Sequence, residues 1–345
     1  MRIQRSHLAV LLNRLYDRGD DRFPIAHPAN EVGELLTVEL GEPEDCTVRF
    51  SKRRDDYASA RDEVRRHHPE PVADDLPEPD EYVKAAVASG IVPIDNYDAV
   101  GTFVDRYGDP DLMAGHPPVF AGFDTNLLPW RIDRILGLRD PDEGVGYVNG
   151  FVLAAGVRDE LDWDVKCHDA DPYVDAFGPA FEEYWNQPVG SGRISRLGLL
   201  AYRDVRDIQQ AEEIDCDRGD EPIVDAYDEW QSEARGQILL FSNDRTFVER
   251  ARGHTILAQH VAFPRDLPRK ATATWREVET LLYVLTLLFG VLELPGVTVR
   301  GVWRGKDGLD WQRERLQLDP RSPILEPRLE CDLAIAESYE ETRVR

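Results

Sequence analysis

The chain has 345 residues, with 66 Asp and Glu against 41 Lys and Arg, which gives a formal net charge of −25 at pH 7. Its length allows two or three domains with substantial cores, and a hydrophobic share of 42% excludes a wholly disordered chain. The acidity argues against a basic surface that covers the whole protein, although it leaves room for a local basic groove that could bind nucleic acid.

The basic residues are unusual in kind, because only 5 of the 41 are Lys. A carboxylate-rich, lysine-poor surface suits a high-salt cytoplasm, since the Debye length falls to about 3 Å at 1 M salt and self-repulsion then costs little. The composition resembles that of haloarchaeal proteins, which implies a halophilic, cytoplasmic protein. An ordinary acidic protein from a GC-rich bacterium is the alternative interpretation.

Targeting and redox signals also point to the cytoplasm. Residues 1–16 interleave Arg with apolar residues, which predicts an amphipathic helix and not a signal peptide. The most apolar stretch, 281–292, is too short to span a bilayer core of about 30 Å, so we expect no membrane association. The 4 Cys residues include no CxxC pair, so neither a zinc knuckle nor a disulfide framework is indicated.

The first region, 1–115, is predicted to be an accessory region that is mostly helical. Leucines at helical spacing predict a helix over 7–18. The stretch 68–81, HPEPVADDLPEPDE, is acidic and Pro-rich, and it predicts an extended linker. The other expected elements are strands over 34–40 and 46–50 and helices over 55–67, 82–88 and 98–107.

The second region, 116–264, has a different pattern. Short apolar runs predict buried strands over 119–123 (VFAGF) and 237–241 (QILLF), with a third over 255–261, and the clearest helical pattern covers 146–161. Buried strands that alternate with helices predict an α/β fold with three layers, α/β/α, around a central parallel sheet.

The third region, 265–345, is predicted to be an extension made of a helix and a β-hairpin. The helix is expected over 275–292. The hairpin is expected over 297–318, with its turn at Lys306, Asp307 and Gly308.

Two of the predicted strands are each followed at once by a polar triplet that contains Asp. DTN (124–126) follows the first strand, and SND (242–244) follows the second. In parallel α/β sheets, ligands bind outside the carboxyl ends of the strands. If the two strands are neighbours, Asp124 and Asp244 therefore lie close together.

Two further acids could join them, since Glu160 lies on a predicted helix and Asp220 precedes another. Several carboxylates around one cleft repel each other unless a divalent cation joins them, and oxygen-only ligands suit Mg²⁺ or Mn²⁺. Such a cluster can hold one or two metals, activate water and stabilise an in-line displacement at a phosphodiester.

The order strand–DTN, helix–EL, GDxxIV–helix, strand–SNDxxF, over about 118–263, resembles the PIN domain, a metal-dependent ribonuclease fold. The resemblance covers less than half of the chain. It implies four catalytic, metal-binding acids (Asp124, Glu160, Asp220 and Asp244) and three supporting polar residues (Thr125, Asn126 and Asn243).

The match departs from the family pattern in two places. Thr246 stands where the family often has another Asp, and the third acid could instead be Asp225 or Asp228. Each piece also has a simpler interpretation, because a strand-end triplet can form an Asx-turn or a helix N-cap, and a helical acid can be merely solvated.

Arginines near the two triplets could bind RNA phosphates, with Arg131 after DTN and Arg245 after SND. Trp130 could offer a stacking face for a base. The alternative is that Arg is the default cation of this chain and that Trp130 belongs to the core.

The sequence therefore predicts a divalent-metal-dependent, PIN-like ribonuclease in RNA processing or turnover, and it leaves open whether the protein forms a homodimer. A catalytically inactive PIN-like RNA-binding or scaffold protein is the first alternative. The second is another Rossmann-like enzyme acting on a small phosphorylated ligand, which predicts an enclosed pocket lined by backbone amides.

Overall fold

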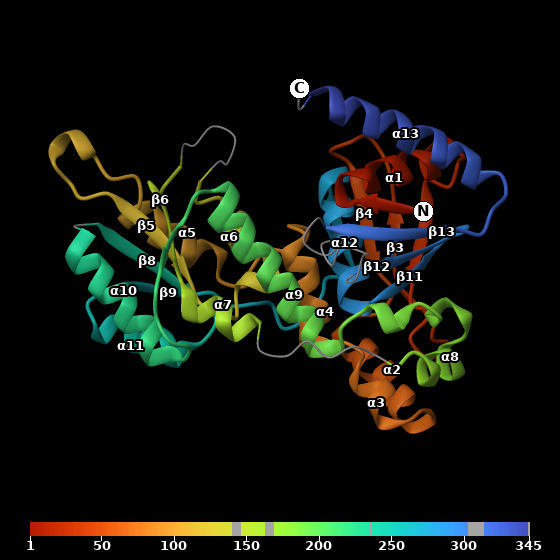
Figure 1. Cartoon of the computed structure of the whole chain (residues 1–345), viewed down its shortest axis with the longest axis horizontal. Coiled ribbons are helices and arrows are strands. Elements are labelled where there is room, and N and C mark those ends of the chain that lie inside the picture. Colours follow the sequence, from red (N-terminus) through yellow and green to blue (C-terminus); the bar gives the residue numbers. More distant parts are fainter. Residues whose placement is uncertain (140–145, 163–168, 235, 303–313, 344–345) are drawn as a thin grey trace. The chain divides into compact units, whose positions relative to one another are not determined.

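The chain folds into two units, each assembled from segments that are distant in the sequence (Figure 1). The structure, a computed structural model, describes residues 1–139, 146–162, 169–234, 236–302 and 314–343. The first unit comprises Met1–Val92, Lys166–Arg193 and Arg265–Arg345, and the second comprises Pro93–Val165 and Ile194–Pro264.

This division differs from the three successive regions that the sequence predicts. Residues 1–92 and 265–345 form one unit because their strands pair in a single sheet, and residues 93–115 belong to the unit that contains the DTN and SND triplets. Strand pairing between the two ends of a chain leaves no local signal in the sequence, so a linear reading separates them.

The first unit is built on an antiparallel sheet of eight described strands, in the order β1-β13-β12-β11-β2-β3-β4-β10. The expected hairpin pairing is confirmed, since Val299 of β12 lies opposite Leu318 of β13, while its turn lies outside the described residues. The strands are β1 (Arg2–Gln4), β2 (Arg22–Ala26), β3 (Glu34–Glu39), β4 (Cys46–Phe50), β10 (Lys270–Ala273), β11 (Val291–Leu294), β12 (Val297–Gly301) and β13 (Arg315–Pro320).

Helix α12 (Trp275–Phe289) is the core helix of this unit. A capping box starts it, because the Thr274 hydroxyl accepts from the amide of Glu277 and the Glu277 carboxylate accepts from the amide of Thr274. It is buried on nearly all sides from Val278 onward, which explains its apolar run. The other helices are α1 (Leu8–Asp17), α2 (Arg54–His67), α3 (Glu70–Asp74), α4 (Pro79–Ala88), α8 (Asp171–Phe177) and α13 (Leu325–Arg343), with short 3-10 turns at Arg5–His7, Pro179–Phe181 and Tyr184–Asn186.

The stretch 68–81 is not an extended linker, so that prediction is wrong. It forms α3 and the first turn of α4, with prolines within the first two positions of both helices. Proline is tolerated there because the first amides of a helix have no partner within it, and acidic residues in the first turn favour the positive end of the helix dipole. The features that suggest a linker are therefore also helix-start signals.

The second unit confirms the α/β expectation with a parallel sheet of five described strands, in the order β7-β6-β5-β8-β9. The expected strands at 119–123 and 237–241 are neighbours, with Phe123 opposite Phe241. The strands are β5 (Val119–Phe123), β6 (Gly150–Ala154), β7 (Glu212–Ile214), β8 (Gln237–Ser242) and β9 (Leu257–His260).

Helices cover both faces of this sheet. On one face, Phe120 of β5 packs edge-on against Trp230 of α10, with ring centroids 5.0 Å apart. On the other, Phe241 of β8 packs against Phe103 of α5 at 5.8 Å. The helices of this unit are α5 (Tyr97–Tyr107), α6 (Ile132–Ile135), α7 (Ala155–Leu161), α10 (Asp220–Ala234) and α11 (Arg245–Gly253), with shorter turns at Leu112–Ala114, Leu128–Trp130 and Asp204–Ile208. Helix α9 (Gly190–Arg203) begins in the first unit and continues into the second.

None of the described helices combines the length and the apolar character needed to cross a membrane.

Candidate functional site

The two polar triplets meet where the strand order of the parallel sheet reverses. Strands β5 and β8 lie side by side, and the chain proceeds outward from them in both directions, to β6 and β7 on one side and to β9 on the other. Asp124 directly follows β5, and Ser242 is the last residue of β8. This switch point is where open α/β sheets bind their ligands.

Asp124 is 6% exposed and is held by neutral donors. The Ser242 hydroxyl donates to its Oδ2 at 2.5 Å, and Asn126 Nδ2 donates to the same oxygen at 2.7 Å. Asn126 Oδ1 in turn accepts from the amide of Asn243 at 3.0 Å. The two triplets thus fix each other, with Asp124 at the centre of their contacts.

The surroundings of Asp124 disfavour the charged form of its carboxyl group. The pKa of its carboxyl group is raised from 3.8 to about 6, chiefly by burial, and the hydrogen bond from Ser242 opposes part of that rise. The negative charges of Glu160 and Asp220 make a smaller contribution to the same rise. Two of the other expected acids, Glu160 and Asp220, therefore act electrostatically on Asp124 at this edge of the sheet.

Glu160 lies on α7, which follows β6 without a loop, and both of its carboxylate oxygens accept hydrogen bonds. The Thr125 hydroxyl donates to Oε2, and the amide of Gly219 donates to Oε1 at 2.9 Å. Gly219 has φ +110°, a conformation that favours glycine, so the turn before α10 can present its amide to Glu160. The side chain that Thr125 holds is therefore that of Glu160.

The structure separates the three candidates for the third acid. Asp220 is the first residue of α10 and is exposed, within electrostatic reach of Asp124. Asp225 and Asp228, further along the same helix, each lie 3.7 Å from His254 of α11. Asp220 therefore fits the site better than Asp225 or Asp228.

Asp244 matches the simpler interpretation of its triplet. Its side chain caps α11, where Oδ1 accepts from the amide of Thr246 at 2.6 Å, and it is exposed to solvent. The positive end of the helix dipole stabilises a carboxylate at the N-cap position. The Asp244 carboxylate therefore already has a structural role at the start of α11.

Oxygen atoms of Asp124, Glu160 and Asp220 form a donor set of the type that Mg²⁺ and Mn²⁺ prefer. Among the residues that the structure describes, no three His, Cys, Asp or Glu side chains are gathered closely enough to hold a metal ion. A cation shared by the three acids therefore requires their side chains to rearrange, and Glu160 is the one held back by Thr125 and Gly219.

Tyr227 of α10 packs against strands β5 and β6 next to the site, and the sequence pattern does not predict this contact. Its buried hydroxyl lies 3.4 Å from the carbonyl of Phe123, the last residue of β5, and 3.3 Å from the carbonyl of Val152 in the middle of β6. Gly122 makes room for the ring, because a Cβ there would lie 2.8 Å from Tyr227 Cε1. A glycine inside a buried strand is the signal that could have indicated this close approach.

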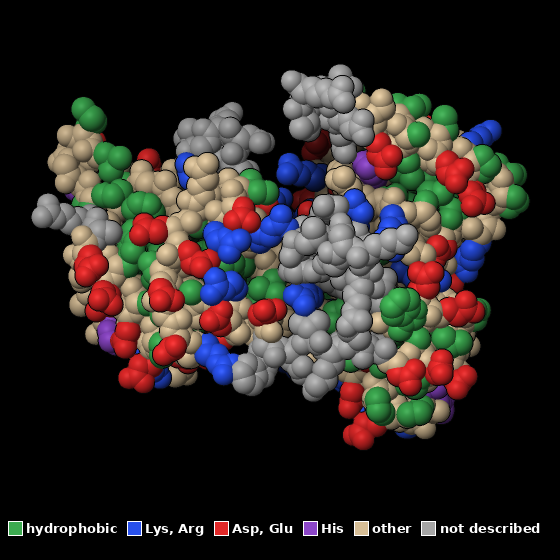
Figure 2. Space-filling model, in the orientation of Figure 1, with side chains coloured by type: hydrophobic (Ala, Val, Ile, Leu, Met, Phe, Trp, Pro, Cys, Tyr) green, Lys and Arg blue, Asp and Glu red, His purple; other side chains and the backbone are tan. Residues whose placement is uncertain are grey.

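The three residues expected to contact RNA differ in their exposure to solvent. Trp130 is buried and so offers no stacking face. Arg131 is only 7% exposed and lies 3.9 Å from Asp204, so it is not placed to bind a phosphate. Arg245, the first residue of α11, is exposed beside the SND triplet. On the face that Figure 2 shows, Lys and Arg side chains are scattered among Asp and Glu.

Comparisons of this chain with protein-family models, with curated proteins and with solved structures find no match.

Proposed function

We propose that the protein is a divalent-metal-dependent ribonuclease of PIN-like type that hydrolyses RNA phosphodiester bonds. One observation supports the proposal above the others, namely the buried Asp124 at the switch point of the parallel sheet, whose pKa is raised to about 6 by burial and by Glu160 and Asp220. A buried carboxylate that is repelled by neighbouring carboxylates favours the binding of a cation.

Asp124, Glu160 and Asp220 would hold Mg²⁺ or Mn²⁺, and Asp244 would act at most from the periphery. When bound, the cation supplies Lewis-acid activation of water and stabilisation of negative charge on the phosphodiester. Ser242 and Asn126 fix the orientation of Asp124, while Thr125 and Gly219 fix that of Glu160. Arg245 is the exposed cation best placed to contact a phosphate of the substrate.

The test is cleavage of single-stranded RNA in the presence of Mn²⁺ or Mg²⁺, at low and at molar KCl. We expect Asp124→Asn to reduce cleavage to background, because it removes the central carboxylate without changing its shape. Asp225→Asn is the matched control. Asp225 lies on α10, the helix that Asp220 begins, but its side chain lies near His254. This variant should cleave RNA at the wild-type rate. Full activity of Asp124→Asn would refute the proposal.

A second candidate is a PIN-like RNA-binding or scaffold protein without catalysis. It is favoured by the two hydrogen bonds that occupy both oxygens of Glu160. This candidate predicts RNA binding that is indifferent to Mn²⁺ and no cleavage by the wild-type protein at any salt concentration.

A further inference from the structure

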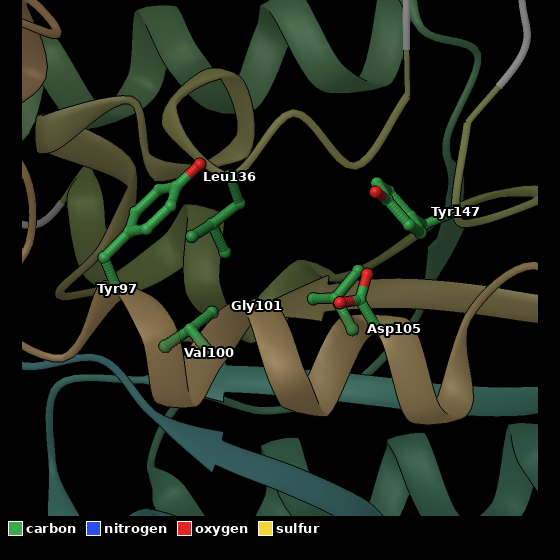
Figure 3. A pocket seen from close by; sticks show the side chains of 7 residues that line it. Tyr97, Val100, Gly101, Asp105, Leu136 and Tyr147 are labelled. Atoms are coloured by element: carbon green, nitrogen blue, oxygen red, sulfur yellow. The ribbon is translucent and has the colours of Figure 1, made fainter.

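A pocket lies on the outer side of α5, in the same unit as the acids (Figure 3). Val100, Gly101 and Val104 of α5 line its floor, and Leu136, just after α6, lines it from another segment. The pocket is partly open, and the cluster of acids does not use it.

Gly101 is the first sign that the pocket has a use. It lies in the interior of α5, where glycine costs about 1 kcal/mol relative to alanine. Packing does not require it, because no described atom beyond the helix's own backbone lies within 4 Å of the position that a Cβ would take. What the missing side chain does provide is space at the floor of the pocket.

The walls are aromatic. Tyr97 and Tyr147 stand on either side of the space, as Figure 3 shows, and they are 54% and 41% exposed. At this exposure, much of the apolar surface of each ring is in contact with water. A planar ligand stacked on a ring would remove that surface from water. Stacking on such rings is how proteins bind the bases of single-stranded RNA, and it depends little on salt compared with phosphate contacts.

Asp105 supplies a polar edge to the pocket, from the same helix. A carboxylate only accepts hydrogen bonds, with two oxygens side by side. Among the four RNA bases, guanine alone presents two adjacent donors, N1–H and the N2 amino group. Adenine and cytosine place a ring-nitrogen acceptor beside their amino group, and uracil flanks its single N–H with two carbonyl groups. The edge of this pocket therefore favours guanine.

The pocket is joined to the same edge of the sheet as the acids. Asn96, immediately before α5, donates to the carbonyl of His260 at 2.8 Å and accepts from the amide of Ala262 at 2.8 Å. His260 Nε2 lies 3.0 Å from the carbonyl of Asn243 in the SND triplet. The N-terminal end of α5, which presents Tyr97, is thus tied to the loop that holds Asp124.

We propose that this pocket binds a guanine base of single-stranded RNA, stacked on Tyr147 and with the base's N1–H and N2 amino group donating to Asp105. The identification of RNA as the source of the base rests on the proposed ribonuclease function. The base preference itself does not, because it follows from the pocket alone.

The experiment measures binding of short fluorescent single-stranded RNAs by anisotropy in EDTA, where no metal-dependent cleavage occurs. One RNA contains a single guanosine within uridines, and the others carry adenosine, cytidine or only uridine. We expect the guanosine RNA to bind the wild-type protein about 10-fold more tightly than the all-uridine RNA. Asp105→Asn should remove this preference, and Asp124→Asn should retain it.

Gly101 provides a variant that should fold at least as well as the wild type. Gly101→Ala should raise the thermal midpoint slightly, because it removes a helix-interior glycine without a clash. Gly101→Val should fill the floor and lower affinity for the guanosine RNA to that of the all-uridine RNA. Circular dichroism of both variants checks that lost binding is not lost folding.

Equal affinities of the wild-type protein for all four RNAs would overturn the proposal, as would a guanosine preference that survives both Asp105→Asn and Gly101→Val. Free GMP that binds as tightly as the guanosine RNA would assign the pocket to a nucleotide and overturn the RNA source. A guanosine preference without any metal-dependent cleavage would leave this pocket intact and refute only the ribonuclease.

Discussion

Two buried aspartates, one in each unit, have nearly equal exposure and opposite surroundings. Asp75 of the first unit is 5% exposed, and Asp124 of the second is 6% exposed. Arg193 donates to Asp75 at 2.9 Å, and the Tyr184 hydroxyl and the amide of Gly190 donate to it at 2.5 and 2.8 Å. Asp124 receives only neutral donors and lies within reach of two further carboxylates.

The two aspartates differ in how their negative charge is balanced. Arg193 is fully buried, and although burial alone would lower its pKa, the charge of Asp75 keeps the pKa of the guanidinium above its ordinary value. That charge is balanced within the fold, and it joins 75 to 193 across a large sequence separation. Among the residues that the structure describes, no cationic side chain pairs with Asp124, whose contacts come from Ser242 and Asn126.

The largest effect is expected where the balanced pair is broken. Arg193→Met should lower the free energy of unfolding by about 3–5 kcal/mol, because it leaves Asp75 buried without its cation. Denaturant unfolding measures the loss. The control is Arg134→Met, which breaks a more exposed pair with Asp204 (2.6 Å) and should cost less than about 1 kcal/mol. Equal losses in the two variants would contradict the contrast.

The second prediction has the opposite sign. Asp124→Asn should raise the free energy of unfolding of the metal-free protein at neutral pH by about 2–3 kcal/mol, since each unit of pKa shift corresponds to about 1.4 kcal/mol. The amide oxygen of Asn can still accept from Ser242 and Asn126.

The pH dependence checks this sign. The pKa of Asp124 is about 6 in the folded protein and 3.8 ordinarily, so between these values the folded state holds a proton that the unfolded state has lost. Stability from this group is therefore full below about pH 4, declines as the pH rises to about 6 and stays low above it. The difference between wild type and Asp124→Asn should follow this course in unfolding curves from pH 4 to 7. A constant difference across that range would contradict it.

A smaller loss of stability is expected from disturbing the contact between Gly122 and Tyr227 next to the acids. Gly122→Ala places a Cβ 2.8 Å from the ring of Tyr227 and should cost about 1–3 kcal/mol through overpacking. Thermal unfolding measures the cost. Gly253→Ala is the control, because a Cβ at the end of α11 meets nothing described within 4 Å and should change stability little. A neutral Gly122→Ala would show that Tyr227 is not held tightly under the site.

Local patterns sufficed where a short segment decides its own structure. The apolar runs 119–123 and 237–241 form strands β5 and β8, and their parallel pairing brings both triplets to one edge of the sheet. The helices expected over 7–18 and 55–67 are also present, as α1 and α2. In these segments the propensity, the periodicity and the tertiary fold agree.

Other segments depend on partners that are far away in the sequence. The clearest helical pattern, 146–161, divides into β6 and α7, because a fully buried strand shows no alternation that distinguishes it from a buried helix. The glycine-rich stretch 190–195 begins α9, whose first amide donates to Asp75. The pairing of Glu160 with Thr125 and the opening above Gly101 also arise only from tertiary packing.

Titration of Mn²⁺ into the metal-free protein by calorimetry tests the central claim most directly. The account predicts stoichiometric binding to the wild-type protein and to Asp225→Asn, and loss of that binding in Asp124→Asn and in Glu160→Gln. Wild-type protein that binds no Mn²⁺, or Asp124→Asn that binds it unchanged, would contradict a metal site at this edge of the sheet.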